Sequence, residues 1–312
     1  NDPDEGLVQV TVIGQGDSAG YITESFDQEG NASVPVDILF VIDNSTSMQD
    51  TNIALQNNFN TFIQGFLTLN LDYQIGVVTT DMQTATDMGQ LQGPIISTAT
   101  PNPVQQFNQN TNVPFTDVLE EQGLDAAHTA LSAPLINSTN AGLVRSGSLL
   151  SVIVISDEDD QSTGIDSNGM IAFLNGYQGD PDLTSLSIVG GPRAGIFPCG
   201  NLFQNAAPVP TYWAVAQATG GIHPNLCNLD MNTIVQQLAV VAAGLDTEFF
   251  LASTPSDPAM IEVTVDGSPV PEDATNGWIY DPATNSIVFA GTGIPLAGSN
   301  VDVSWPLTST CP

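Results

Sequence analysis

The sequence predicts an α/β protein in which a doubly wound, mostly parallel β-sheet is flanked by helices and followed by a small all-β module. Nearly continuous apolar runs, typical of strands buried on both faces of a sheet, recur along the first part of the chain. Amphipathic helical patterns separate these runs, which is the spacing of βαβ units. After about residue 253 the pattern changes to short strands joined by Asp-Gly, Pro and Asn turns.

The strands of the expected sheet are visible as apolar segments. They are VDILFVI (36–42), YQIGVVTT (73–80), LLSVIVIS (149–156) and LTSLSIV (183–189). A further stretch, LVQVTVI (7–13), alternates apolar and polar residues and also predicts a strand. The sequence leaves open whether this strand joins the main sheet or the β module. The Gly-, Ser-, Asp- and Glu-rich segment that follows it is expected to be a loop.

Three segments show helical patterns. The first is an amphipathic series with steps of three and four residues, formed by Leu55, Phe59, Phe62, Ile63, Phe66 and Leu67. Helical character returns over 118–131, which stops before Pro134, and over 234–241. The Asn-, Gln- and Pro-rich residues from the second strand to about 113 are expected to form a long connection.

These patterns divide the chain into three parts. Residues 1–34 are expected to form an N-terminal strand and linker, 35–252 the α/β domain, and 253–312 a small antiparallel β module. The segment TPSDP (254–258) marks the last boundary.

The charge balance excludes several partners. The chain has 34 acidic residues but only 2 Lys or Arg, which gives a net charge of −32. Nucleic acid is excluded because phosphate binding needs a basic surface, and anionic membranes are disfavoured for the same reason. No apolar run is long enough to span a membrane. Self-repulsion at this charge favours a saline or calcium-rich exterior. The alternative is a composition bias of the whole source lineage.

The cysteines and the first residues agree with an extracellular or cell-surface location. In an oxidising compartment Cys199 and Cys227 are expected to pair, whereas the state of Cys311 stays open. The polar start at Asn1 is expected to be a mature or trimmed terminus. Because the chain keeps so few cations, we also expect Arg145 to form a specific ion pair.

A group of oxygen-bearing side chains follows two of the expected strands. Asp43, Ser45 and Ser47 alternate directly after the first buried strand, and Asp157 follows the strand at 149–156. Thr116 supplies a third hydroxyl from a separate loop. Carboxyl ends of parallel strands share one edge of a sheet, where ligands bind. Such oxygens suit Mg²⁺, Mn²⁺ or Ca²⁺. The alternative is that the hydroxyls only cap turns and helices.

The motif DNSTS at Asp43–Ser47 resembles the DxSxS motif of von Willebrand factor A domains. Thr116 resembles their separate metal-binding threonine, and VIVISD, ending at Asp157, resembles their strand-borne aspartate. The resemblance covers roughly residues 36–250. More specifically, the chain is similar to secreted or lipid-anchored bacterial proteins in which a small β module follows the A domain. It implies one divalent cation in a metal-ion-dependent adhesion site. Ser45 and Ser47 would be direct ligands, Thr116 a ligand or near-ligand, and the two aspartates direct or water-bridged contacts.

The function expected from this resemblance is extracellular adhesion, in which a protein or acidic glycan binds through the metal. The main alternative is a structural subunit of a surface layer, filament or matrix that self-assembles. An enzyme is a distant third, because no nucleophile–base pair can be assembled from the motifs. Neither His128 nor His223 has metal-site spacing.

Other acidic residues near these motifs receive weaker assignments. Asp81, which ends the second strand, is a candidate for an outer shell of the site. Asp159, Asp160 and Asp166 are expected to form a solvated acidic rim, because the spacing from Asp157 does not match a calcium-binding EF-hand loop.

Overall fold

The structure, a computed structural model, describes residues 9–13, 20–28, 34–68, 71–116, 120–193, 199–201, 204–227, 231–274, 276–282, 284–289, 293–296 and 298–307. It divides into two compact units. One comprises Ser33–Ala243, and the other joins Asn1–Ala32 to Gly244–Pro312. The α/β unit is therefore inserted in sequence between the two parts of a β unit.

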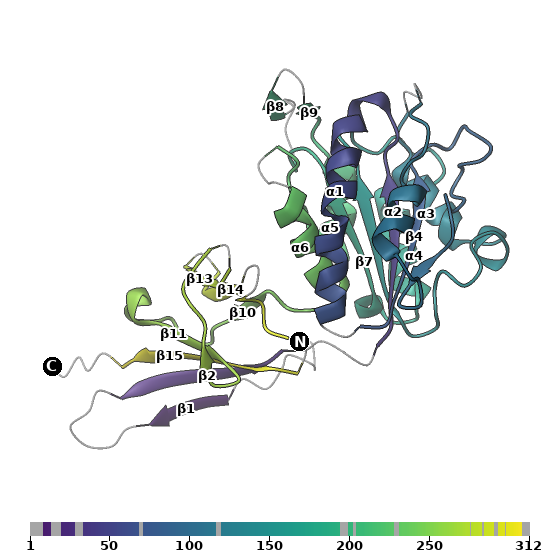
Figure 1. The fold of residues 1–312 in the computed structure, drawn as a ribbon. Helices are drawn as coiled ribbons and strands as arrows, with labels where there is room; N and C mark the ends of the chain where they lie inside the picture. The colour runs from purple at the N-terminus through teal and green to yellow at the C-terminus, as the bar shows by residue number, and fades with distance from the viewer. Residues whose placement is uncertain are drawn as a thin grey trace. The chain divides into compact units, whose positions relative to one another are not determined.

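The α/β unit contains a five-stranded sheet in the order β5-β4-β3-β6-β7 (Figure 1). Its strands are β3 (Val36–Ile42), β4 (Tyr73–Thr79), β5 (Ile96–Ser97), β6 (Leu149–Ile155) and β7 (Thr184–Val189). The pairs β3–β4, β3–β6 and β6–β7 are parallel, whereas β5 runs antiparallel to β4. The predicted fold class is confirmed, and the four apolar runs are strands within one residue of their expected bounds.

Helices cover both faces of this sheet (Figure 1). They are α1 (Gln49–Thr68), α2 (Pro103–Asn110), α3 (Gly123–Leu131), α4 (Ser167–Tyr177), α5 (Pro210–Ala218) and α6 (Met231–Ala242). Short 3-10 turns occur at Thr46–Met48, Leu135–Asn137, Pro181–Leu183 and Pro258–Met260. In the described part of the chain, no helix is both long and apolar enough to cross a membrane.

The alternating side chains of β3 explain why its sequence is apolar throughout. Phe40 meets the rings of Phe59 and Phe62 on α1 and of Phe107 on α2, with centroids 5.2–6.1 Å away. Its neighbours in sequence point the other way: Leu39 belongs to the core that contains the buried residues of α3, α4 and α5. Because both faces of the strand are covered, neither can carry a polar stripe.

Helix α2 was not predicted, because its segment was expected to be only a connection. The helix begins with Pro103 and is otherwise mostly Gln and Asn, so it has few apolar residues from which to recognise a period. Its burial depends largely on Phe107, which is 0% exposed and stacks on Phe59 at a centroid distance of 3.4 Å. The helix expected over 118–131 begins only at Gly123, and residues 117–119 lie outside the described part of the chain.

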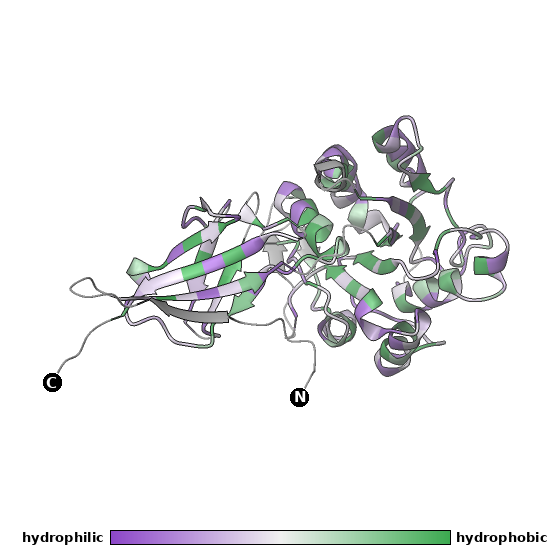
Figure 2. Cartoon of the chain, turned by 90° about the horizontal axis from the view of Figure 1, so that it is seen from below, coloured by the Kyte–Doolittle hydropathy of each residue, from purple (hydrophilic) through white to green (hydrophobic). Residues whose placement is uncertain are grey.

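The β unit contains two antiparallel sheets. One has the order β1-β2-β15-β11-β12 and the other the order β10-β14-β13. The strands are β1 (Gln9–Ile13), β2 (Tyr21–Asp27), β10 (Glu248–Phe250), β11 (Glu262–Val265), β12 (Ser268–Pro269), β13 (Trp278–Asp281), β14 (Ser286–Phe289) and β15 (Asn300–Pro306). Residues of both sheets form one core that includes Trp278 and Trp305. Figure 2 shows the banding along these strands that results when alternate residues face the core.

The N-terminal strands belong to the β unit, which answers the question that the sequence left open. β1 pairs with β2, and β2 pairs with β15 near the other end of the chain. Glu24 on β2 is 0% exposed and accepts the backbone N–H groups of Ala252 (2.7 Å) and Ser253 (2.9 Å). The expectation of a loop after the first strand was therefore wrong for Tyr21–Asp27, where long-range pairing outweighs the polar composition.

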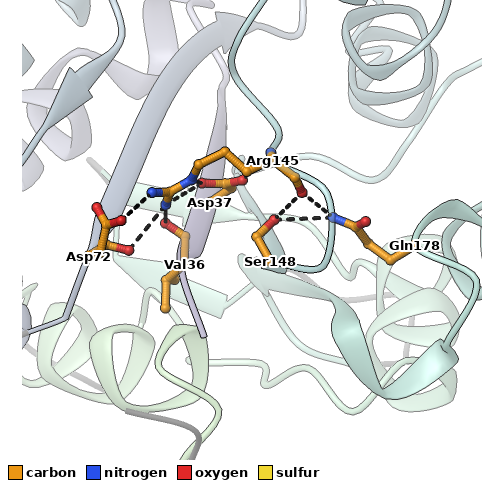
Figure 3. A network of polar contacts seen from close by, with 6 residues as sticks. All are labelled: Val36, Asp37, Asp72, Arg145, Ser148 and Gln178. Carbon is orange, nitrogen blue, oxygen red and sulfur yellow. Dashed lines mark hydrogen bonds and ion pairs between the residues drawn. The ribbon is translucent and has the colours of Figure 1, made fainter. Parts of the chain in front are cut away.

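A single arginine joins three segments at the start of β3 (Figure 3). Arg145 donates from Nε to Asp37 Oδ1 at 2.8 Å and from Nη1 to Asp72 Oδ2 at 2.7 Å. Its Nη2 also lies 2.6 Å from Asp37 Oδ1 and donates to the carbonyl of Val36 at 3.2 Å. The predicted ion pair of Arg145 is confirmed. The sequence did not show that Asp37, inside an apolar strand, would be its fully buried partner.

The cysteine pairing stays a prediction. Cys227 is disulfide-bonded, but the side chains of Cys199 and Cys311 lie outside the described part of the chain. Cys199 begins β8 (Cys199–Asn201), which pairs with β9 (Gln204–Ala206). We expect Cys199 to be the partner and the crosslink to contribute on the order of 3 kcal/mol by restricting the unfolded chain. Peptide mass mapping of the unreduced, alkylated protein checks this, and a Cys227–Cys311 peptide would contradict it.

Candidate metal centre

The candidate centre lies where β3 and β6 end at the same edge of the sheet. Asp43 directly follows β3, and its backbone N–H bonds to the carbonyl of Ile155 at the end of β6 (3.0 Å). Its carboxylate is 0% exposed. Oδ1 accepts the N–H of Ser45 at 2.8 Å, and Oδ2 accepts the hydroxyl of Ser156 at 2.7 Å. Both oxygens are thus held in place, and neither meets a basic side chain among the described residues.

Ser45, Ser47 and Asp157 form a continuous chain of oxygen atoms beside Asp43. The hydroxyls of Ser45 and Ser47 lie 2.9 Å apart, and Ser47 donates to Asp157 Oδ1 at 3.2 Å. Ser47 is exposed, whereas Ser45 and Asp157 are half-buried. The edge of the sheet therefore presents these oxygens to solvent.

Backbone contacts hold Thr116 next to Ser45. It forms an isolated parallel bridge with Ser45, and its N–H donates to the carbonyl of Asn44 at 2.9 Å. Asn44 also holds the preceding loop, because its side-chain amide donates to the carbonyl of Pro114 at 3.2 Å. The structure therefore places Thr116 beside the motif at Asp43–Ser47.

Negative charge is concentrated at this edge. Burial, together with the charges of Asp43 and Glu158, raises the pKa of Asp157 to about 6, against the opposing hydrogen bond from Ser47. A bound cation would offset this repulsion and favour the ionised carboxylates.

Glu121 is a member of this site that the sequence did not reveal. It is 4% exposed, accepts the hydroxyl of Thr80, and lies close enough to Asp43 for the charge of that carboxylate to act on it. Burial and then the charge of Asp43 raise its pKa to about 8. No motif marked it, because it lies on a loop between Thr116 and α3 and reaches Asp43 only through the fold.

The residues present fit a hard divalent cation. All the candidate ligand atoms are carboxylate or hydroxyl oxygens, which suits Mg²⁺ or Ca²⁺ rather than zinc or copper. Asp43 is already held through both oxygens, which is compatible with a water-bridged contact to a cation. Within the described residues, no three His, Cys, Asp or Glu side chains are grouped so that they could hold a metal. The candidate ligands include only two such side chains, Asp43 and Asp157, because the other three are hydroxyls.

The acidic run after Asp157 has a role beyond the solvated rim that we expected. Asp159 accepts the N–H and hydroxyl of Thr211 in the first turn of α5, the latter at 2.6 Å. Asp160 accepts the N–H of Leu124 at 3.0 Å at the start of α3. Asp166 caps α4 by accepting from the N–H of Gly169 at 2.8 Å. These aspartates anchor helix N-termini, where a negative charge is favourable. Asp166 is exposed, as expected for a solvated rim, whereas Asp159 and Asp160 are half-buried and hold α5 and α3.

No family model matches this chain, and no curated protein matches it. Among solved structures, it is similar to the pilus adhesin SpaC from Lactobacillus rhamnosus GG in its open conformation. The two share 10% identity at a TM-score of 0.50, over 98% of this chain and 43% of the adhesin. The chain therefore spans less than half of the adhesin's length, and the likeness concerns the fold alone. It agrees with the α/β architecture and strand order described above.

Two further proteins of known structure are similar to this chain at TM-scores below 0.5, which is too low to indicate a shared fold. Proximal thread matrix protein 1 from the mussel byssus matches at 13% identity and a TM-score of 0.45, over 72% of this chain and 51% of its own. In another structure that mussel protein has a zinc-occupied MIDAS motif, at a TM-score of 0.44. The conserved hypothetical protein BatB from Bacteroides thetaiotaomicron matches at 15% identity and a TM-score of 0.39, over 66% of this chain and 98% of its own.

Proposed function

We propose that the α/β unit binds one divalent cation, Mg²⁺ or Ca²⁺, and through it recognises an acidic group of an extracellular protein or glycan. The ligands would be Asp43, Ser45, Ser47, Thr116 and Asp157. The observation that carries this proposal is the solvent-facing chain of oxygens at Ser45, Ser47 and Asp157 beside the buried carboxylate of Asp43. Binding rather than catalysis is proposed, because this donor set consists of the carboxylate and hydroxyl oxygens that a hard divalent cation prefers.

The charge of the donor set favours an acidic ligand. Two carboxylates only about neutralise a divalent cation, and three hydroxyls add no charge. Five protein ligands leave a position of an octahedron open to an outside oxygen. At a net charge of −32 the rest of the protein repels anions, so the metal would have to supply the local attraction.

Binding to an acidic probe should therefore require the metal. The probes are immobilised peptides that carry either glutamate or glutamine at one position, so that the members of a pair differ only in one carboxylate. 3′-Sialyllactose against lactose serves as a second pair, in which the acidic member adds one sialic acid residue. We expect the acidic member to bind in Mg²⁺ or Ca²⁺, and EDTA or Asp157→Ala to abolish binding. Asp50→Ala removes the same charge from an exposed position near the site and should bind normally. Equal binding in EDTA would place the contact elsewhere.

The salt dependence should also be unusual. Moderate salt screens the repulsion between the negative protein and an acidic ligand, whereas the metal contact is short and less screened. We expect affinity for the acidic probe to be higher in 0.15 M than in 0.01 M NaCl, at a constant concentration of divalent cation. Ordinary charge-steered binding weakens as salt rises, so a steady loss of affinity would contradict the proposal.

A structural subunit is the second candidate, and the surface of the β unit favours it. In the described residues, several large apolar side chains of this unit are well exposed, including Phe250 (60%) and Met260 (50%). Its larger sheet also ends in two edge strands, β1 and β12. Exposed edges and apolar side chains are means of self-association. Light scattering over a concentration series, with and without Ca²⁺, distinguishes assembly from a monomeric binding protein.

A further inference from the structure

Arg193 is one of only two lysine or arginine residues in a chain with 34 acidic ones. The other, Arg145, is occupied by two aspartates, whereas Arg193 forms no ion pair with a carboxylate in the part of the chain that the structure describes. Arg193 is exposed, and its guanidinium lies over the ring of Trp213 at 4.1 Å from the centroid. This cation is therefore accessible to an acidic group from another molecule.

His223 holds one side of the Arg193 guanidinium. Arg193 Nε donates to Nδ1 of His223 at 3.3 Å, so Nδ1 accepts and the proton of the neutral imidazole lies on Nε2. Nε2 in turn donates to the carbonyl of Gly191 at 2.6 Å. Among the described residues, Nη1 and Nη2 of Arg193 donate to no acceptor. With one face on Trp213 and Nε on His223, the guanidinium is fixed while these two nitrogens stay accessible to a ligand.

Arg193 follows the strand next to the candidate metal centre. β6 and β7 are parallel neighbours, and Asp157 follows β6 as Gly191 follows β7, so both lie at the same edge of the sheet. Ala207 joins the two segments. Its N–H donates to the carbonyl of Asp157 at 2.7 Å, and a side chain at Gly191 would collide with its carbonyl oxygen. The backbone that carries Arg193 is therefore packed against the backbone that holds Asp157.

We propose that Arg193 binds a second carboxylate of the ligand whose first carboxylate the metal centre binds, so that the partner is a peptide segment with two acidic side chains. This inference rests on the proposed function, because it takes the metal as the first contact. A planar guanidinium donates two parallel hydrogen bonds to a carboxylate, and a fixed one loses less freedom on binding. In an extended peptide, side chains on one face recur about every 7 Å, which suits groups that follow neighbouring strands.

Side-chain NMR of the full chain tests this contact, because the chain has two arginines and no lysine. A ¹H–¹⁵N spectrum contains only two arginine Nε–H signals, which Arg193→Met assigns. The probes are glycine–serine peptides with blocked termini, which carry one glutamate or have a second glutamate two, three, four or six residues later. In saturating Mg²⁺ we expect a two-glutamate peptide to shift the Arg193 signal and leave the Arg145 signal in place. Glutamine at the second position should abolish the shift.

Affinities measured with the same peptides give a second readout. Arg193→Met should weaken binding of the two-glutamate peptide about 10-fold and leave binding of the one-glutamate peptide unchanged. Arg193→Lys keeps the charge but loses the two parallel hydrogen bonds, so its affinity should lie between. Gln105→Glu makes the protein more negative by one charge, as Arg193→Met does, at an exposed position on α2, and should bind like the wild type. Thermal melting checks that each variant is folded.

The outcomes distinguish this contact from the proposed function. If binding requires Mg²⁺ but Arg193→Met matches the wild type with every peptide, the metal contact stands and the second contact is refuted. If a two-glutamate peptide binds equally well in EDTA and still shifts the Arg193 signal, the metal contact fails while Arg193 remains a carboxylate-binding residue. If no peptide binds in Mg²⁺ or in EDTA, both are refuted.

Discussion

Arg145→Met is expected to destabilise the α/β unit by about 3–5 kcal/mol, the usual cost of removing one partner from a buried ion pair. The Asp37 carboxylate is 0% exposed and would be left without its cation, whereas Asp72 is 62% exposed and would regain water. The loss arises chiefly from Asp37, because a buried charge without a partner keeps its full desolvation cost. For a unit of this size the melting temperature should fall on the order of 10 °C.

The chain offers a matched control in its other arginine. Arg193→Met removes the same charge from an exposed position over Trp213, which should cost about 0.5–1 kcal/mol. Arg145→Met combined with Asp37→Leu should recover much of the lost stability, since both charges of the buried pair are then gone. Urea unfolding measures all three variants. If Arg145→Met costs no more than Arg193→Met, the network in Figure 3 does not support the sheet as described.

The metal-free protein should lose stability as the pH rises from about 5 to 8. In the folded protein Glu121 has a pKa of about 8, against 4.5 when it is not perturbed. Between these values the unfolded chain releases the proton while the folded protein retains it. Each pH unit then lowers the free energy of unfolding by at most about 1.4 kcal/mol. Asp157, with a pKa of about 6, acts in the same direction over a narrower range.

Thermal unfolding in EDTA at constant ionic strength measures this effect. Glu121→Gln should flatten the curve and be more stable than the wild type at pH 8, whereas the exposed Glu120→Gln should follow the wild type. Saturating Mg²⁺ or Ca²⁺ should oppose the decline, because a bound cation favours the ionised carboxylates. A wild-type curve that stays level or rises between pH 5 and 8 in EDTA would contradict this assignment.

The sequence predicted the motif residues of the candidate centre but not the residues around them. Asp43, Ser45, Ser47 and Asp157 follow strands, so their common edge could be inferred from the rule that parallel strands end together. Glu121 carries no local signal, and its place beside Asp43 depends on how the loop before α3 returns to the sheet. The anchoring roles of Asp159 and Asp160 likewise required the positions of α5 and α3. Whether these side chains bind a cation stays a prediction.

The same division holds for the fold. The sequence by itself determined the parallel sheet, because strands buried on both faces must be apolar throughout and can be recognised without knowing their neighbours. Only the tertiary structure decided the rest. β2 is a strand because its backbone pairs with β15, which lies more than 270 residues later in the chain, and α2 is buried through Phe107 against α1. Asp37 is tolerated inside an apolar strand because Arg145 arrives from a distant loop. In each case the stabilising partner is remote in sequence, so the local pattern of residues could not contain it.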